Sequence, residues 1–171
     1  DGARCEGAVE RGPAVIVRVG HTLLMTVDDV RPFAAPAVHE RDDRVKRLSG
    51  KIDRVLVDAP CSGLGTLRRN PDLKWRQNPK AIEEMAVKQL AILQSAARLL
   101  KPGGRLVYAV CTLTRPETTD VVAAFSAKHP EFEPCVIPHP FDPAAAPSAE
   151  RMFWPQDTGG NGMFVAAWTK L

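Results

Sequence analysis

Two cysteines and an aspartate, each placed just after an apolar run, form the pattern in this 171-residue sequence that most strongly suggests chemistry. Asp58 and Cys61 follow the run at 55–57, and Cys111 follows a second run at 105–110. A thiolate is a strong nucleophile near neutral pH, and a nearby carboxylate can hold a proton or a polar group. No histidine lies within either motif, which argues against a papain-like hydrolase. The residues alone leave open a redox pair, a nucleophile with a helper, or buried apolar thiols.

Two strands and a helix must position these side chains. Each apolar run is typical of a buried strand, and Pro60 and Gly63 end the first strand in a tight loop. Between the runs, residues 79–100 are predicted to form a helix with Asn78 as its N-cap. A strand–helix–strand unit makes its strands parallel neighbours, and ligands bind beyond the carboxyl ends of such strands. We therefore expect the two thiols and the carboxylate to share one cleft.

The rest of the chain predicts how the sheet continues. A helix is expected from Thr114, as its cap, to about Lys128. Further strands are expected at 14–19, 22–27, 132–137 and 163–169. Alternating strands and helices that end in a late strand pair predict an α/β sheet with an antiparallel edge.

A basic segment with one tryptophan follows the first motif. Arg68, Arg69, Lys74 and Arg76 surround Trp75. Cations suit phosphates and an indole suits a base, so this segment is a candidate RNA-binding surface. The alternative is that Trp75 fills the core beneath a loop while the cations are simply solvated.

Length and composition are ordinary for one globular domain, so residues 1–171 are expected to form a single domain. The net charge of +3 permits an anionic partner without requiring one. No run of about 18 apolar residues is present and the first residues lack signal-peptide features. An intracellular protein without a membrane partner is expected, cytoplasmic or, in a eukaryote, nuclear or nucleolar. The four cysteines show no metal-type spacing, so no metal is expected.

Several motifs carry a family resemblance. They are DAPCSG at 58–63 with Gly65, RNPDLKW at 69–75, LKPGGRLVY at 100–108 and CTL at 111–113, with WP at 154–155 and NGMFVAA at 161–167. Together they closely resemble the RNA 5-methylcytosine methyltransferases of the Sun/Fmu (RsmB-like) type. The resemblance implies a Rossmann-like class I methyltransferase sheet, mostly parallel with an antiparallel C-terminal strand. It also implies S-adenosylmethionine as the cofactor and an rRNA or tRNA as the partner.

The same resemblance implies a role for each motif residue. Cys111 matches the nucleophile that adds to carbon 6 of cytosine, and Cys61 matches the cysteine that assists proton removal from carbon 5 and product release. Asp58 matches the acid that holds the cytosine edge, and the base must leave its stack to reach such a cleft. Asp29, or its neighbour Asp28, resembles the acid that contacts the adenine end of the cofactor. Cofactor-binding residues are thus expected to be Asp29, Asp58 and Pro60, and substrate-binding residues Pro60, Arg68, Arg69, Lys74 and Trp75.

The sequence also departs from the family pattern. Val110 stands where the family usually has Thr or Ser, Asn161 where Asp is commoner, and Met163 where an aromatic residue is usual. The glycine-rich cofactor loop expected before these motifs is not in the chain, so a partial catalytic domain lacking the first strands is expected. Two alternatives follow: a non-catalytic RNA-binding module, or a redox or thiol-transfer protein that uses Cys61 and Cys111.

Overall fold

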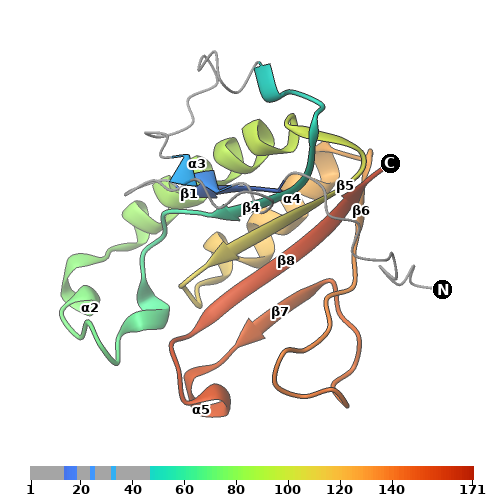
Figure 1. The fold of residues 1–171 in the computed structure, drawn as a ribbon. Coiled ribbons are helices and arrows are strands. Elements are labelled where there is room, and N and C mark those ends of the chain that lie inside the picture. Colours follow the sequence, from blue (N-terminus) through green and yellow to red (C-terminus); the bar gives the residue numbers. More distant parts are fainter. Residues whose placement is uncertain (1–13, 19–23, 26–31, 34–46) are drawn as a thin grey trace.

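A six-stranded sheet organises the chain in the computed structural model, which describes residues 14–18, 24–25, 32–33 and 47–171 (Figure 1). Its strand order is β1-β4-β5-β8-β6, and β7 pairs with β8. The strands are β1 (Ala14–Arg18), β4 (Ile52–Asp58), β5 (Leu100–Val110), β6 (Phe132–Pro134), β7 (Glu150–Phe153) and β8 (Met163–Lys170). Two short strands, β2 (Leu24–Met25) and β3 (Pro32–Phe33), pair only with each other in the described residues.

The sheet has a parallel and an antiparallel part. β1, β4 and β5 are parallel neighbours, and β8 runs antiparallel to β5, β6 and β7. The predicted α/β sheet with an antiparallel C-terminal strand is thereby confirmed. The parallel register places Asp58 beside Ala109, so the ends of β4 and β5 lie side by side.

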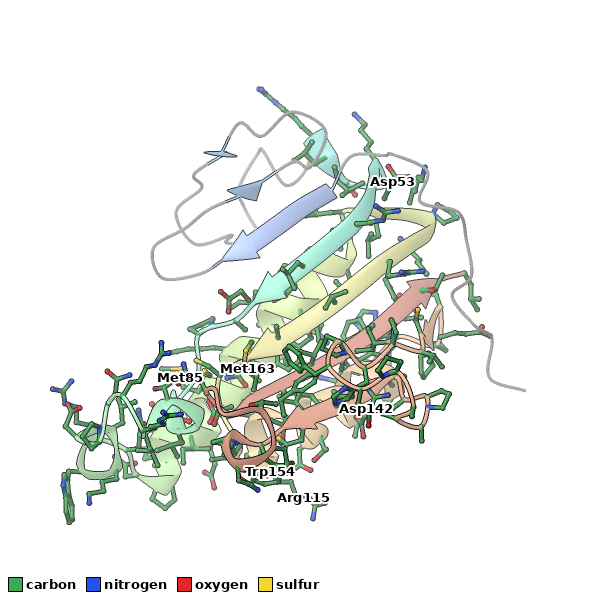
Figure 2. The ribbon with its side chains drawn as sticks, turned by 60° about the horizontal axis from the view of Figure 1, so that its bottom comes forward. Asp53, Met85, Arg115, Asp142, Trp154 and Met163 are labelled. Carbon is green, nitrogen blue, oxygen red and sulfur yellow. The ribbon has the colours of Figure 1, made fainter. Side chains whose placement is uncertain are left out.

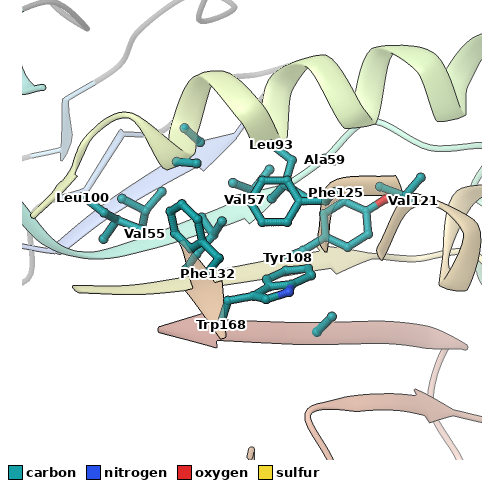
Figure 3. Packing of buried hydrophobic residues seen from close by; sticks show 14 of the residues in the cluster. Val55, Val57, Ala59, Leu93, Leu100, Tyr108, Val121, Phe125, Phe132 and Trp168 are labelled. Carbon is teal, nitrogen blue, oxygen red and sulfur yellow. The ribbon is translucent and has the colours of Figure 1, made fainter. Parts of the chain in front are cut away.

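Two helices pack against one face of this sheet (Figures 1 and 3). α3 (Pro79–Ala97) begins as predicted, because the Asn78 side chain accepts a hydrogen bond from the backbone N–H of Ala81 at 2.9 Å. The helix ends before Leu100, which pairs with Ile52 at the start of β5. The predicted end at residue 100 was therefore wrong, because sheet pairing prevails over the apolar periodicity of the helix.

The second helix, α4 (Thr119–Lys128), starts later than predicted. A short 3₁₀ turn, η2 (Arg115–Glu117), precedes it, and the Thr114 hydroxyl caps no backbone N–H. That hydroxyl instead donates to the carboxylate of Glu117 at 2.7 Å. Thr114 and Glu117, which have the spacing of a capping box, therefore bond to each other and do not cap the helix.

The core lies between the two helices and the sheet (Figure 3). Phe125 of α4 packs on Trp168 of β8 with ring centroids 4.9 Å apart, and Leu93 of α3 and Tyr108 of β5 are fully buried beside them. Burial of a large apolar side chain contributes roughly 1.5–3 kcal/mol. This packing fixes the helices on β4 and β5, whose carboxyl ends carry the motif residues.

The remaining helices are short. η1 (Leu64–Thr66) and α2 (Leu73–Arg76) lie between β4 and α3, and α5 (Pro155–Thr158) lies between β7 and β8. Within the described residues, none of the helices has the length and apolar character needed to span a bilayer.

Candidate active site

The two thiols meet at the carboxyl edge of the parallel strands. Asp58 is the last residue of β4, Cys61 lies in the loop after it, and Cys111 directly follows β5. The two sulfur atoms are 3.4 Å apart, and both cysteines are free and half-buried. The structure therefore places the two thiols in contact, and the Asp58 charge is near enough to act on Cys111.

The contact between the thiols makes them chemically unequal. Hydrogen bonding from Cys61 lowers the pKa of Cys111 to about 7, against the opposing effects of burial and of the nearby Asp58 and Glu117 charges. The same hydrogen bond, together with burial, raises the pKa of Cys61 far above its ordinary range. Cys61 is thus the proton donor of the pair, and Cys111 is the thiol that ionises near neutral pH.

A buried carboxylate underlies the pair. Glu117 is fully buried, and its Oε1 accepts from the backbone N–H of Ser62 at 2.7 Å. Its Oε2 accepts from the hydroxyls of Ser62 at 2.5 Å, Thr112 at 3.0 Å and Thr114 at 2.7 Å. Ser62 directly follows Cys61, and Thr112 directly follows Cys111. Both cysteine loops are therefore fastened to one side chain.

Two more side chains complete this buried network. The side-chain amide of Gln89, on α3, donates to Glu117 Oε1 at 3.0 Å and to the carbonyl of Pro60 at 2.9 Å. The Tyr108 hydroxyl donates to the backbone carbonyl of Glu117 at 2.8 Å. Sequence reasoning missed this network, although Gln89 is the single polar residue in the apolar stripe of the helix and Glu117 follows Thr114 at capping-box spacing.

A close approach of backbones joins the first motif to the C-terminal loop. The N–H of Gly65 donates to the carbonyl of Cys111 at 3.0 Å, and the N–H of Gly162 donates to the carbonyl of Gly65 at 2.7 Å. A Cβ at position 65 would lie only 2.2 Å from the Gly162 oxygen. Glycine is therefore required here because the chains touch.

The start of β8 lies at the same edge of the sheet as the two cysteine loops. Met163 follows the loop at 159–162, and its neighbour Phe164 pairs with Val110, the residue before Cys111. Figure 2 shows Met163 and Trp154 near one end of the sheet and Asp53 near the other. Both Met163 and Trp154 are exposed, so two large apolar side chains face solvent at this end of the sheet.

The basic segment projects from the site into solvent. Arg68, Arg69 and Lys74 are exposed, and the Trp75 side chain is 81% exposed with the Lys74 ammonium 4.8 Å from its ring centroid. The alternative in which Trp75 fills the core is therefore wrong. Arg68 donates to the carbonyl of Gly159 at 2.6 Å, which ties the segment to the C-terminal loop.

The other expected ligand residues are placed as follows. Pro60 is half-buried between Asp58 and Cys61, with its carbonyl held by Gln89. Asp29 and its neighbour Asp28 lie outside the described residues. Within the part of the chain that the structure describes, no group of three or more His, Cys, Asp or Glu side chains is arranged to hold a metal ion.

Known proteins are similar to this chain in sequence. The family model described as 16S rRNA methyltransferase RsmB/F matches residues 23–169. Ribosomal RNA small subunit methyltransferase B of Thermus thermophilus is 46% identical over 105 residues, which are 61% of this chain and 26% of that protein. The putative methyltransferase Rv1407 of Mycobacterium tuberculosis is 39% identical over 133 residues, which are 76% of this chain and 29% of that protein.

Solved structures share the fold. The crystal structure of PH0851 is 36% identical with a TM-score of 0.68, and the likeness covers 80% of this chain and 31% of that one. The crystal structure of NSun6 from Pyrococcus horikoshii with SFG is 28% identical with a TM-score of 0.61, over 78% of this chain and 33% of that one. The chain thus spans about a quarter of the length of the curated relatives and about a third of the length of these structures.

Proposed function

Because this chain belongs to the 16S rRNA methyltransferase RsmB/F family, we propose that its protein methylates carbon 5 of a cytosine in RNA through a covalent cysteine adduct. 16S rRNA is the proposed substrate, so the protein would work where small ribosomal subunits are assembled. The observation that carries the proposal is the pair of free thiols 3.4 Å apart, one of which has its pKa lowered to about 7.

Cys111 is the proposed nucleophile. Carbon 5 of cytosine is a poor nucleophile, and covalent addition divides one difficult step into two easier ones. The Cys111 thiolate forms a bond to carbon 6, and the electron pair of the 5,6 double bond moves to carbon 5. A thiol with a pKa of about 7 is roughly half ionised at neutral pH, so the attacking form is available without a histidine.

Cys61 is the proposed proton acceptor in the second half of the reaction. In the resting site, its contact with Cys111 raises its pKa and keeps it protonated. Once the Cys111 sulfur is bonded to carbon 6, that sulfur no longer carries a negative charge, and this effect on Cys61 falls away. Cys61 can then lose its own proton to solvent, and the resulting thiolate takes the proton from carbon 5 of the methylated base. The electron pair of that C–H bond re-forms the 5,6 double bond, and the bond to Cys111 breaks to release its thiolate.

Asp58 is the proposed contact for the base. A carboxylate at the end of β4 can accept a hydrogen bond from the exocyclic amino group of cytosine. Its charge reaches Cys111, as its effect on the pKa of that thiol indicates. A base held by Asp58 therefore lies within reach of the nucleophile, with Pro60 beside it in the same loop. The target base must first be turned out of its stack.

The proposed methyl donor is S-adenosylmethionine, which supplies an activated methyl group when bound. The carboxyl edge of β4 and β5 is compatible with it, since cofactors of such sheets bind beyond the strand ends. Asp58 and Pro60 are the described residues proposed to hold it, and Asp29 is proposed for its adenine end. The relative NSun6 of known structure, solved with SFG, an analogue of this cofactor, supports the assignment.

The basic segment is the proposed RNA surface. Arg68, Arg69 and Lys74 can neutralise phosphates, and the exposed indole of Trp75 offers a face for base stacking. The hydrogen bond from the Gln77 side chain to the carbonyl of Ser62 links the end of this segment to the loop of Cys61. RNA held on the segment is thus held next to the thiol pair.

Methyl transfer to transcribed 16S rRNA tests the proposal, using the full-length protein and S-adenosylmethionine with a radiolabelled methyl group. We expect the label in 5-methylcytosine after nuclease digestion. Cys111→Ala should lose transfer, whereas Cys61→Ala should accumulate a covalent protein–RNA adduct that survives denaturing electrophoresis. Full turnover by Cys111→Ala would remove the nucleophile assignment. RNA binding by the wild type without methyl transfer would instead support a non-catalytic RNA-binding module.

A further inference from the structure

We propose that Glu117 is a positioning residue whose buried carboxylate holds the loops of Cys61 and Cys111 at the separation that lets one thiol donate to the other. The methylation chemistry above assigns no role to Glu117. The inference deepens that chemistry and, as a statement about catalysis, rests on it. Its test measures the reactivity of the two thiols in the protein without RNA or cofactor. Failure of the positioning proposal can therefore be distinguished from failure of the methylation proposal.

The contacts of Glu117 come from three separate parts of the chain. Ser62 contributes its N–H and its hydroxyl from the first loop, Thr112 and Thr114 contribute hydroxyls from the second, and Gln89 contributes its amide from α3. All five groups can donate, and a carboxylate offers about four acceptor sites, so these donors fill its acceptor capacity. The residues that directly follow the two cysteines therefore both bond to the same carboxylate.

Burial of the Glu117 carboxylate carries a desolvation cost that a purely structural residue would avoid. Burying a charge costs several kcal/mol unless hydrogen bonds and charges compensate it. Here the compensation comes from donors of the two cysteine loops and from Gln89 of α3, while the surface-facing residues of α4 take no part. The carboxylate thus spans the two loops and does not serve as a helix cap.

The charge of Glu117 works against the nucleophile. It raises the pKa of both Cys61 and Cys111, as expected for a nearby negative charge. If Glu117 acted on the thiols through its field alone, its loss would make Cys111 more acidic. The hydrogen bond between the thiols acts in the opposite direction and depends on their 3.4 Å separation. The sign of the effect therefore separates positioning from a simple field effect.

Glu117→Gln provides the test, because it removes the charge and keeps the shape. The glutamine oxygen can still accept from Ser62 and Gln89, but its NH₂ group replaces the acceptor shared by three hydroxyls. We expect looser loops, with slower alkylation of Cys111 by iodoacetamide at pH 7, quantified by mass spectrometry of the Cys111 peptide. The decrease should be several-fold, up to the roughly fifteen-fold expected if Cys111 returned to an ordinary thiol pKa of about 8.5. Cross-linking of Cys61 to Cys111 by a short bifunctional thiol reagent should fall as well.

Two further variants keep the test decisive. Asp120→Ala, on the exposed side of α4, removes a surface ion pair with Arg115 and should match the wild type in both thiol assays. Thr112→Val removes one hydrogen-bond donor at nearly constant shape, so alkylation of Cys111 should slow by a smaller factor. This variant tests the proposal if Glu117→Gln does not fold. Thermal unfolding of each variant shows whether the protein is intact. Faster or unchanged alkylation of Cys111 in folded Glu117→Gln would overturn the proposal.

Discussion

Cys61 and Cys111 are separated by 50 positions in the chain, yet their sulfur atoms lie 3.4 Å apart. Neither residue belongs to a helix or a strand; each lies just beyond the end of a parallel strand. The contact therefore depends on the pairing of β4 with β5 and on the loops that follow them. This arrangement makes the acidity of Cys111 a property of the folded sheet.

The acidity of Cys111 should depend on Cys61. In the wild type, alkylation of Cys111 should fall as the pH is lowered through about 7, because the thiolate is then protonated. Cys61→Ala removes the hydrogen bond that lowers this pKa, so the profile should move toward the ordinary value of about 8.5, and the rate at pH 7 should drop by up to about fifteen-fold. Peptide mass spectrometry across a pH series measures both. An unshifted profile in Cys61→Ala would contradict the hydrogen-bond assignment.

Asp58→Asn should separate thiol acidity from catalysis. The Asp58 charge raises the pKa of Cys111, so its removal should speed alkylation of Cys111 below pH 7. Methyl transfer should nevertheless fall by about 10²-fold or more, the usual contribution of a group that handles protons or polar edges of the substrate. Parallel alkylation and methylation assays on the full-length protein provide the check. If both rates rise together, Asp58 does not bind the base.

Trp75→Ala should weaken RNA binding and leave stability nearly unchanged. The indole is 81% exposed, so the free energy of unfolding should change by no more than about 0.5 kcal/mol. Loss of one stacked base costs about 1–3 kcal/mol of binding free energy. Val87→Ala truncates an apolar side chain on α3 that is 71% exposed; it is the matched control and should bind RNA normally. Filter binding at fixed salt distinguishes the two, and equal affinities would exclude stacking on Trp75.

Gly65→Ala should destabilise the protein and disturb the site together. Its new methyl group would meet the backbone oxygens of Gly162 and Cys111 at 2.2 and 2.8 Å, so one chain must move. Overpacking of this kind costs about 1–3 kcal/mol, which lowers the Tm of a domain of this size by roughly 3–10 °C. Gly160→Ala, whose methyl group meets only the Thr158 hydroxyl at 3.6 Å, should unfold at the wild-type temperature. Calorimetry on the two variants tests the difference.

The elements that carry the thiols could be predicted because local signals and topology agree there. Apolar runs mark β4 and the second half of β5, and Asn78 marks the start of α3. A helix between two buried strands makes those strands parallel neighbours, which brings their carboxyl ends to one edge. The juxtaposition of Cys61 and Cys111 follows from these few inferences.

The hydrogen bonds of Glu117 and the strand β7 could not be predicted in the same way. Glu117 reads locally as part of a helix cap, and only the fold shows that Ser62, 55 positions earlier, is its partner. β7 (Glu150–Phe153) lies at the end of a stretch with loop-like composition and forms because β8 offers it a pairing edge. Both features depend on contacts between distant segments, which a single sequence does not report.

In the proposed reaction, the dependence of Cys111 on Cys61 ties the reactivity of the nucleophile to completion of the sheet. A copy of the protein that has not completed its sheet carries a thiol of ordinary acidity, roughly fifteen-fold less ionised at neutral pH than one with a pKa of about 7. Such a chain would carry too little thiolate for the proposed attack on a pyrimidine. Under the proposed mechanism, competence for this attack is gained only when β4 and β5 have paired.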